Sequence, residues 1–505
     1  MSKGADVFNL AWHCLGRQAE TRPGKTALIL ADAPDRFRAF TYGELDASVR
    51  RLAGGLREAG LKKGERVMIR AANDIDFVLA FFAVTAIGCV AQPASLLLTH
   101  REAVALARDS GASAIFLGAA GADERALFAD LKVFDRDETL RLAAAGEAAD
   151  YAPTAPDDPA YLVFTSGSTA EPKGVLHGHR VVIGRWPMAA DWLGLAEDEV
   201  VLHAGNINWT YTLGVGVLDP FANGATGALY AGPRDKAVWP KLIERTGATI
   251  FAAVPGVYRE ILKHADLAGA DLSRLRHGLA AGEALAPDLL AEWRARAGTW
   301  LYEALGMSEV STYISNRPGE PIRPGSPGRP QRGRRVAILP VEGGSQPLEP
   351  GEVGLLAVHR SDPGLMLGYW NRPEEEAQAF RGEWFVGGDL AEFDADGYVW
   401  HHGRNDDLMN AFGYRVSPLE VEKALASHPG VADVAVAERK AAEHVSIVAA
   451  FVVPKGEAPL DEAALIAHCA ERLAAYKRPR RIVFVRELPR TANGKLARRL
   501  LPQLT

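Results

Sequence analysis

The chain has 505 residues and a formal net charge of −6. This length exceeds what one hydrophobic core usually holds, so two or more domains are expected. The charge is slightly negative and the Lys and Arg residues are scattered along the chain, which argues against an extended basic surface for nucleic acid. We therefore expect no nucleic-acid partner.

The three cysteines, Cys14, Cys89 and Cys469, lie far apart and form no C-x-x-C pair, a pattern typical of a reducing compartment. We interpret them as small buried hydrophobic residues. The N-terminus lacks a basic region followed by an apolar core, and the most apolar run, residues 77–91, is too short and too interrupted to span a bilayer. The sequence predicts no membrane span and a cytoplasmic location.

The N-terminal part alternates helices with strands. Thr41 and Glu44 form a T-x-x-E capping box before a helix that ends at Gly60. The elements expected next are a strand at 67–69, an apolar helix at 75–86 and a strand at 88–91. Residues 140–160, rich in Ala, Pro and Asp, are predicted to be a connector. This alternation is typical of an α/β fold.

The stretch Y-L-V-F-T-S-G-S-T-A-E-P-K-G at residues 161–174 runs from an apolar strand into a loop rich in glycines and hydroxyls. Glycines let backbone N–H groups approach an anion, hydroxyls donate hydrogen bonds, and a lysine adds positive charge. The loop predicts a polyphosphate site made of Thr165, Ser166, Gly167, Ser168, Thr169, Lys173 and Gly174. Pro172 before the lysine and Gly174 after it differ from a Walker A loop, which disfavours a P-loop kinase or ATPase. A solvated Ser/Thr turn is the alternative.

Two aromatic residues follow a strand expected at 200–203. Trp209 and Tyr211 stand two apart among small residues, before an apolar helical stretch. They are candidates for the walls of a pocket, with ordinary core aromatics as the alternative.

Carboxylates follow two later strands. Glu283 lies in the small-residue segment G-L-A-A-G-E-A-L, and Glu309 ends L-Y-E-A-L-G-M-S-E. In open α/β sheets, ligands bind at the carboxyl ends of strands, so both acids are candidates for ligand or Mg²⁺ contacts. Taken singly, each is more often a surface acid.

A β-rich region follows, and it contains Asp389 in W-F-V-G-G-D, a candidate for binding the hydroxyls of a ribose. The polar segment G-R-N-D-D at 403–407 is where we place the main boundary. The predicted domains are therefore a large one at 1–404 and a small α+β one at 405–505.

In the small domain, Ser417 and Glu420 predict a second capping box, with Pro418 in the first helical turn. A further helix is expected at 461–474, between strands at 431–437, 446–453 and 482–485. Lys495 follows Asn-Gly and is expected at the tip of an exposed turn, where a solvated charge is the alternative.

Together these stretches resemble the adenylate-forming superfamily of acyl- and aryl-CoA synthetases, luciferases and peptide-synthetase adenylation domains. The resemblance covers nearly the whole chain through motifs in a fixed order: T-S-G-S-T-x-E-P-K-G, G-E-A-L, G-M-S-E, G-G-D, G-R-x-D-D, G-Y-R-V-S-P-L-E-V-E and P-R-T-x-x-G-K. It implies an α/β fold, with a large multi-sheet N-terminal domain carrying a β-rich subdomain and a small mobile α+β C-terminal domain. It also implies an enzyme that uses ATP, Mg²⁺ and coenzyme A, first joining a carboxylic acid to AMP with release of pyrophosphate and then passing the acyl group to CoA.

The resemblance also implies roles for individual residues. Lys495 matches the catalytic lysine that bridges the carboxylate and the α-phosphate, with Lys173 and Glu309 as further catalytic residues. Thr165 and Glu309 match the groups that place Mg²⁺, and Asp406 matches the hinge. The adenine and ribose site maps to Gly282, Glu283, Ala284, Leu305, Gly306, Met307, Ser308, Asp389 and Arg404, the acyl pocket to Trp209, Tyr211, Ala280 and Ala281, and the CoA tunnel to Gly413 and Tyr414.

Three positions depart from the pattern: Ala170 stands where glycine is usual, Leu305 where an aromatic residue often stacks on adenine, and Gly387 where Ser or Thr is common. Small alanines and a glycine beside two aromatics indicate a compact apolar acid, either aromatic or medium-chain. The alternatives are an adenylation enzyme that loads a carrier protein and a non-catalytic ligand-binding homologue. A homodimer is a further expectation.

Overall fold

In the computed structural model, the described residues are 7–165, 172–233, 235–405, 407, 409–411, 414–442, 445–456, 460–473, 475–491 and 496–504. They divide into two compact units. One unit comprises Met1–Arg335 and Val358–Glu383, and the other comprises Val336–Ala357 and Trp384–Thr505. Among the described residues, no helix is long and apolar enough to cross a membrane.

The first unit holds a nine-stranded sheet in the order β15-β14-β13-β12-β11-β9-β10-β1-β2. Its strands are β1 (Thr26–Ala33), β2 (Arg36–Thr41), β9 (Val200–His203), β10 (Thr226–Tyr230), β11 (Ile250–Ala253), β12 (His277–Ala281), β13 (Trp300–Met307), β14 (Ser311–Ser315) and β15 (Arg329–Pro330). From β1 to β13 the neighbours pair in parallel, whereas β2, β14 and β15 are antiparallel additions at the edges. The parallel strands therefore end at one common edge, where ligands of open α/β sheets bind.

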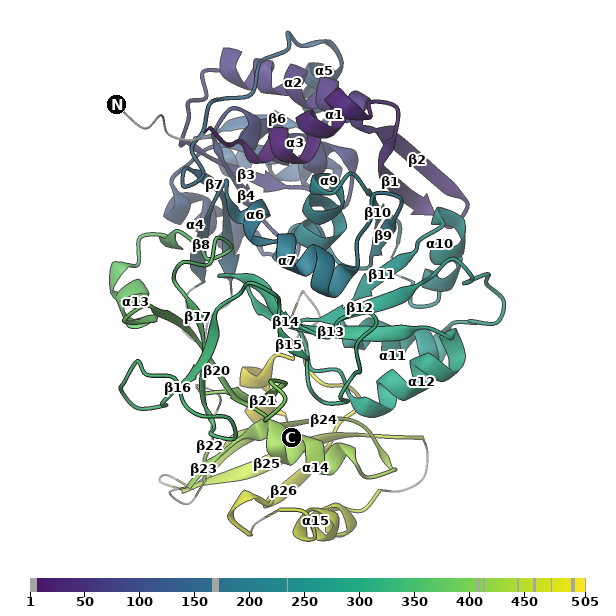
Figure 1. Cartoon of the computed structure of the whole chain (residues 1–505), viewed down its shortest axis with the longest axis vertical. Helices are drawn as coiled ribbons and strands as arrows, with labels where there is room; N and C mark the ends of the chain where they lie inside the picture. Colours follow the sequence, from purple (N-terminus) through teal and green to yellow (C-terminus); the bar gives the residue numbers. More distant parts are fainter. Residues whose placement is uncertain are drawn as a thin grey trace. The chain divides into compact units, whose positions relative to one another are not determined.

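The strands of this sheet are buried on both faces because helices cover it. Along one side lie α10 (Trp239–Thr246), α11 (Pro255–His264) and α12 (Pro287–Ala297) (Figure 1). Strand alternation divides the apolar residues between two cores: Phe251 and Ala253 pack in the core with Trp293, and Ile250 and Ala252 pack in the core with Trp192.

The second sheet of the first unit has seven strands in the order β18-β8-β7-β4-β3-β5-β6. They are β3 (Arg66–Arg70), β4 (Val90–Pro93), β5 (Ala112–Leu117), β6 (Lys132–Asp135), β7 (Pro159–Thr165), β8 (Lys173–Gly178) and β18 (Gly368–Tyr369). Helices α2 (Tyr42–Glu58), α3 (Ile75–Ala86), α4 (His100–Ser110) and α5 (Arg136–Ala145) precede or connect these strands (Figure 1). Every residue of α3 is buried, which matches its apolar sequence.

The second unit contains β16 (Val336–Leu339), β17 (Gly354–His359), β20 (Trp384–Phe393) and β21 (Val399–Arg404) in one sheet, and the hairpin β22 (Met409–Ala411) with β23 (Tyr414–Val416). A third sheet joins β24 (Val431–Ala442), β25 (Val445–Pro454) and β26 (Arg481–Phe484), with α14 (Pro418–Ala426) and α15 (Glu462–Ala470) beside it. Leu465, Cys469 and Leu473 share one core, although α15 ends at Ala470, before the predicted helix end at residue 474.

Several local predictions are confirmed. Thr41 and Glu44 form the expected capping box, and Gly60 follows the helix with φ of +82°. The apolar helix at 75–86 is present with the expected bounds. All three cysteines are free and buried.

Two local predictions are wrong. Residues 140–145 are not part of a connector but of α5, because the carboxylate of Asp135 accepts a hydrogen bond from the Glu138 N–H and caps an alanine-rich helix. Ser417 does not close a capping box, because its hydroxyl donates to the carbonyl of His402 at 2.6 Å. Pro418 does occupy the first turn of α14.

Candidate active site

The predicted phosphate loop connects two paired strands. Strands β7 and β8 pair antiparallel in a register that places Thr165 opposite Lys173, and the Thr165 hydroxyl lies 3.5 Å from the Lys173 carbonyl. Ser166, Gly167, Ser168 and Thr169 lie outside the described residues. The register therefore places a threonine and a lysine opposite each other at the start and end of the loop.

Gly174 has a packing role in this hairpin. A methyl group there would lie 3.0 Å from side-chain atoms of both Leu162 and Trp370. Its carbonyl accepts a hydrogen bond from the Trp370 N–H at 2.8 Å, beside the pairing of β8 with β18. Glycine is needed here so that these strands can approach closely.

Lys173 faces a carboxylate and an aromatic ring. Its ammonium lies 2.8 Å from Oε2 of Glu375 on α13 (Pro373–Gln378), with side-chain exposures of 22% and 33%. The same ammonium lies 5.5 Å from the centre of the Tyr369 ring, within the range of a cation–π contact. These two contacts orient the Lys173 side chain.

Tyr369 also holds the carboxylate predicted to bind Mg²⁺. Its hydroxyl donates to Oε1 of Glu309 at 2.8 Å, and the Glu309 carbonyl accepts from the Met366 N–H at 2.7 Å. One tyrosine therefore connects Lys173, through its ring, to Glu309, through its hydroxyl. These residues are distant in the sequence, and the pairing of β18 with β8 brings them together.

Side chains of His177 and Arg185 hold the turn that carries Glu309. Nε2 of His177 lies 2.8 Å from the Ser308 carbonyl; since a carbonyl can only accept, this nitrogen carries the proton. Burial lowers the pKa of His177 to about 4, so the imidazole is neutral near pH 7. At the other end of the turn Ser311 has φ of +79°, and its hydroxyl contacts the guanidinium of Arg185.

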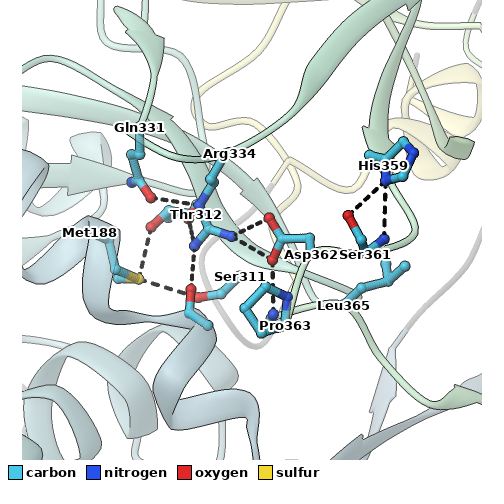
Figure 2. A network of polar contacts seen from close by, with 12 residues as sticks. Met188, Ser311, Thr312, Gln331, Arg334, His359, Ser361, Asp362, Pro363 and Leu365 are labelled. Carbon is cyan, nitrogen blue, oxygen red and sulfur yellow. Dashed lines mark hydrogen bonds and ion pairs between the residues drawn. The ribbon is translucent and has the colours of Figure 1, made fainter.

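Arg185 and Arg334 form two buried ion pairs around this turn. Arg185 contacts both oxygens of Asp219, at 2.6 and 2.7 Å. Figure 2 shows Arg334 reaching Asp362 on one side, and Thr312 and Gln331 on the other. Arg334 lies 2.8 Å from each oxygen of Asp362, which begins the segment leading to Tyr369. Arg185 connects Ser311 to Asp219, and Arg334 connects the Thr312 carbonyl to Asp362. Breaking either ion pair would leave an uncompensated buried charge.

The predicted adenine segments follow β12 and β13. Gly282 has φ of +94°, and a methyl group there would lie 3.0 Å from the Trp209 ring. The left-handed backbone of Gly282 ends β12 at Ala281, although the segment G-L-A-A-G-E-A-L continues to Leu285. The Leu285 N–H donates to Oε1 of buried Glu303 at 2.9 Å, which ties this loop to β13. The remaining predicted positions there are Glu283, 3.6 Å from Arg259, exposed Ala284, and Leu305, Gly306, Met307 and Ser308 at the end of β13.

Three of the four predicted acyl-pocket residues lie together. The Tyr211 ring is edge-on to Trp209 at 5.4 Å between centres, and Tyr211 shares a core with Ala281. Ala280 packs instead in the core with Tyr258 and Trp293, because neighbouring residues of a strand point to opposite faces, and its place in the acyl pocket stays a prediction. Trp209, Tyr211 and Ala281 remain as candidates.

The predicted ribose residues belong to the second unit. Asp389 and Arg404 are directly paired across β20 and β21. Nε2 of His401 lies 3.1 Å from Oδ1 of Asp389, and a methyl group at Gly388, which has φ of +89°, would lie 2.9 Å from the Arg404 guanidinium. The structure therefore places Asp389 and Arg404, the two residues predicted to bind the ribose, side by side. Lys495, Asp406, Gly413 and the Tyr414 side chain lie outside the described residues.

The donors in the first unit suit Mg²⁺, an ion that takes oxygen ligands and is commonly held by one or two carboxylates plus substrate phosphates. The Glu309 carboxylate and the Thr165 hydroxyl supply such oxygens. Within the described residues, no group of three or more His, Cys, Asp or Glu side chains forms a metal cage. A site completed by nucleotide phosphates agrees with both observations.

Comparison with known proteins identifies the family. The family model described as "AMP-binding enzyme" matches residues 15–370, and the model described as "AMP-binding enzyme C-terminal domain" matches residues 420–495. The chain belongs to the AMP-binding enzyme family. It is 35% identical over 513 residues to a benzoate–CoA ligase of Thauera aromatica, covering 97% of this chain and 95% of the relative. It is 30% identical to the acetyl-coenzyme A synthetase of Bacillus subtilis, covering 98% and 90%.

A solved AMP-binding enzyme shows the same architecture. The crystal structure of an anthranilate CoA ligase in complex with anthranoyl-AMP superimposes with a TM-score of 0.89 at 31% identity, covering 98% of this chain and 97% of that one. The predicted adenylate-forming fold, with a large α/β domain and a smaller C-terminal domain, is therefore confirmed. The predicted enzyme class, an AMP-forming acid–CoA ligase that uses ATP, Mg²⁺ and CoA, is confirmed as well.

The residues that support this candidate site were not predicted from the sequence. Tyr369, Arg185 and Arg334 were not singled out, although the first contacts Glu309 and the other two support its turn. Tyr369 follows Gly368 in a short apolar segment, and nothing local distinguishes it from a core aromatic. The pairs that Arg185 and Arg334 form with Asp219 and Asp362 span 34 and 28 residues, which is beyond any local pattern.

Proposed function

We propose that this acid–CoA ligase activates a compact monocarboxylic acid, aromatic or medium-chain, at the carboxyl edge of the nine-stranded sheet. The observation that carries the proposal is the arrangement around Tyr369, which presents an ammonium and a carboxylate at one place beside the glycine-rich loop. A polyphosphate with a divalent cation needs this pairing of groups. The apolar wall of Trp209, Tyr211 and Ala281 supports a compact apolar acyl group.

In the first half-reaction, an acid carboxylate must approach the α-phosphate of ATP although both are negatively charged. Two like unit charges about 4 Å apart repel by about 4 kcal/mol at an effective dielectric near 20. We assign Lys173 and the loop residues 165–169 to the β- and γ-phosphates, and Lys495 to the carboxylate and α-phosphate. Mg²⁺, when bound by Glu309 and Thr165, supplies further positive charge to the phosphates. These groups reduce the repulsion where charge develops.

We assign nucleotide recognition to the following residues. The loop of Gly282, Glu283 and Ala284 and the end of β13, residues 305–308, would flank adenine. Asp389 would accept hydrogen bonds from the ribose hydroxyls, with Arg404 beside it. His401, hydrogen-bonded to Asp389, would fix the orientation of that carboxylate.

In the second half-reaction, we propose that residues 405–505 rotate about Asp406 relative to residues 1–404. The rotation would withdraw Lys495 and bring Gly413 and Tyr414 to the site, where a glycine leaves space for the pantetheine arm of CoA. A cytoplasmic location and a homodimeric assembly complete the proposal.

A pyrophosphate-release screen over carboxylic acids, each with and without free CoA, tests this proposal. We expect aromatic or medium-chain acids to release pyrophosphate, and CoA to raise turnover and yield the thioester. Pyrophosphate release that free CoA leaves unchanged would instead favour a carrier protein as acceptor. The absence of release with every acid would contradict the proposed activity.

A further inference from the structure

His203 is a buried polar residue at the edge where the proposed acyl group binds. It is the last residue of β9 and is 1% exposed. Its ring lies edge-on to Tyr211, with 4.4 Å between centres, and Tyr211 in turn contacts Trp209. His203 therefore stands behind the aromatic wall, at the carboxyl end of a parallel strand.

The protonation state of His203 follows from its contacts. The Gly205 N–H donates to Nδ1 at 2.9 Å, so Nδ1 acts as an acceptor and carries no proton. Burial lowers the pKa of the imidazole to about 3, which keeps the ring neutral near pH 7. The single ring proton is therefore on Nε2. Among the described residues Nε2 has no hydrogen-bond partner, so a buried donor is left available.

A second unsatisfied polar atom lies nearby. Thr212 in α8 (Thr210–Leu213) is fully buried, and among the described residues its hydroxyl has no hydrogen-bond partner either. A methyl group at Gly205 would lie 2.2 Å from the Thr212 hydroxyl oxygen and 3.1 Å from Cε1 of His203. The two side chains thus flank the same backbone position. A buried polar group without a partner is costly, and a site with two of them suits a ligand that supplies the missing bonds.

An unpartnered nitrogen alone does not mark a site. His179 has the same pattern, because its Nδ1 accepts the Leu10 N–H at 3.0 Å and its Nε2 has no partner among the described residues. His179 follows β8, however, and lies beside Asp158 and Lys63. His203 differs from His179 in two ways. Its ring contacts the proposed acyl wall, and the unsatisfied Thr212 hydroxyl lies beside it.

We propose that His203 and Thr212 form a subsite for a hydroxyl group on the carboxylic acid substrate. This inference rests on the proposed acyl pocket and narrows its ligand to a hydroxyl-substituted acid, most simply a hydroxybenzoate. A hydroxyl oxygen accepts from the Nε2–H of His203, while its proton is donated to the Thr212 oxygen. An acid with a methyl group in the same position has a similar shape but leaves both protein groups unsatisfied.

The test compares kcat/KM for each ring position of hydroxybenzoate with that for the methylbenzoate of the same position. Wild type is expected to prefer one hydroxy acid over its methyl analogue by at least about tenfold, because rejecting the analogue rests on unpaired buried groups. Thr212→Val removes only the hydroxyl and should cut this ratio severalfold. His203→Phe should bring it close to one. In both variants the KM for ATP should stay unchanged.

His179→Phe is the matched control, since it replaces an equally buried neutral histidine that does not lie at the carboxyl edge of the nine-stranded sheet. It should leave the hydroxy-to-methyl ratio at the wild-type value. A wild-type ratio near one at every ring position, or a ratio that both Thr212→Val and His203→Phe leave intact, would overturn the subsite and assign these polar atoms to buried water. Thioester formation from unsubstituted acids would still support the proposed function in that case, whereas no reaction with any acid would refute the function itself.

Discussion

Glu375 neutralises the lysine that we assign to the nucleotide phosphates, so ATP must displace this carboxylate when it binds. The charge-neutralising change Glu375→Gln removes that competition while keeping the shape of the side chain. At the 2.8 Å separation of Nζ and Oε2, two unit charges attract by about 6 kcal/mol at an effective dielectric near 20. The two side chains are 22% and 33% exposed, and partly exposed pairs of this kind contribute about 1 kcal/mol or less.

We therefore expect Glu375→Gln to lower the KM for ATP by up to about fivefold, since about 1.4 kcal/mol corresponds to a factor of ten. The KM for the acid should stay unchanged. Initial rates of pyrophosphate release at varied ATP measure this directly. Glu374→Gln is the matched control, because Glu374 is an exposed neighbour on the same short helix and the charge change is identical.

A raised KM for ATP in Glu375→Gln would refute the reasoning, because it would mean that the carboxylate orients Lys173 for the phosphates rather than competing with them. Lys173→Met separates this outcome from a wrong assignment of the lysine. If Lys173→Met leaves the KM for ATP unchanged, the ammonium does not contact the phosphates at all.

Three further predictions concern neighbouring groups and overall stability. Tyr369→Phe keeps the ring beside Lys173 but removes the 2.8 Å hydrogen bond to Glu309, so the Mg²⁺ concentration for half-maximal rate should rise about tenfold, the worth of a hydrogen bond to a charged group; an unchanged Mg²⁺ dependence would remove Tyr369 from this role. Lys495→Ala should slow adenylate formation at least about a hundredfold, yet spare thioester formation from supplied acyl-adenylate, and equal loss in both half-reactions would contradict the assignment. Burial lowers the pKa of several histidines to about 3 or 4, so the unfolded chain takes up protons below about pH 6.5 that the native state binds only near pH 4, and the free energy of unfolding should fall as pH drops through this window. Burial raises the pKa of Asp76 to about 6, so the contribution of Asp76 to the free energy of unfolding grows as pH drops and offsets part of this loss. Equal free energies of unfolding in urea titrations at pH 5 and pH 7 would contradict the predicted fall. The histidines concerned are His13, His177, His179, His203 and His277.

Local patterns predicted local structure well. The capping box of Thr41 and Glu44 and the helix Ile75–Ala86 depend on residues a few positions apart, and both are present. The same kind of pattern failed at Ser417, because its hydroxyl found a carbonyl 15 residues away. A capping box competes with tertiary partners that the sequence does not reveal.

Motif order predicted the fold and the reaction class, but not how the site is held. Ala280 and Ala281 were treated alike, although strand alternation puts them on opposite faces. Tyr369 lies 60 residues from Glu309, and only the pairing of β18 with β8 shows that it connects this acid to Lys173. Supporting contacts of this kind depend on topology, because the partners share no periodicity and no motif.

This chain joins its acid to AMP before transferring it to CoA. The most direct test uses a substrate carboxylate labelled with ¹⁸O, incubated with the enzyme, ATP, Mg²⁺ and CoA, followed by mass spectrometry of the nucleotide product. Attack of the carboxylate on the α-phosphate, and later release of AMP, leaves one labelled oxygen in AMP for each thioester formed. We expect that single label in AMP together with unlabelled pyrophosphate. Label in inorganic phosphate with ADP as the nucleotide product, or AMP without label, would contradict the account.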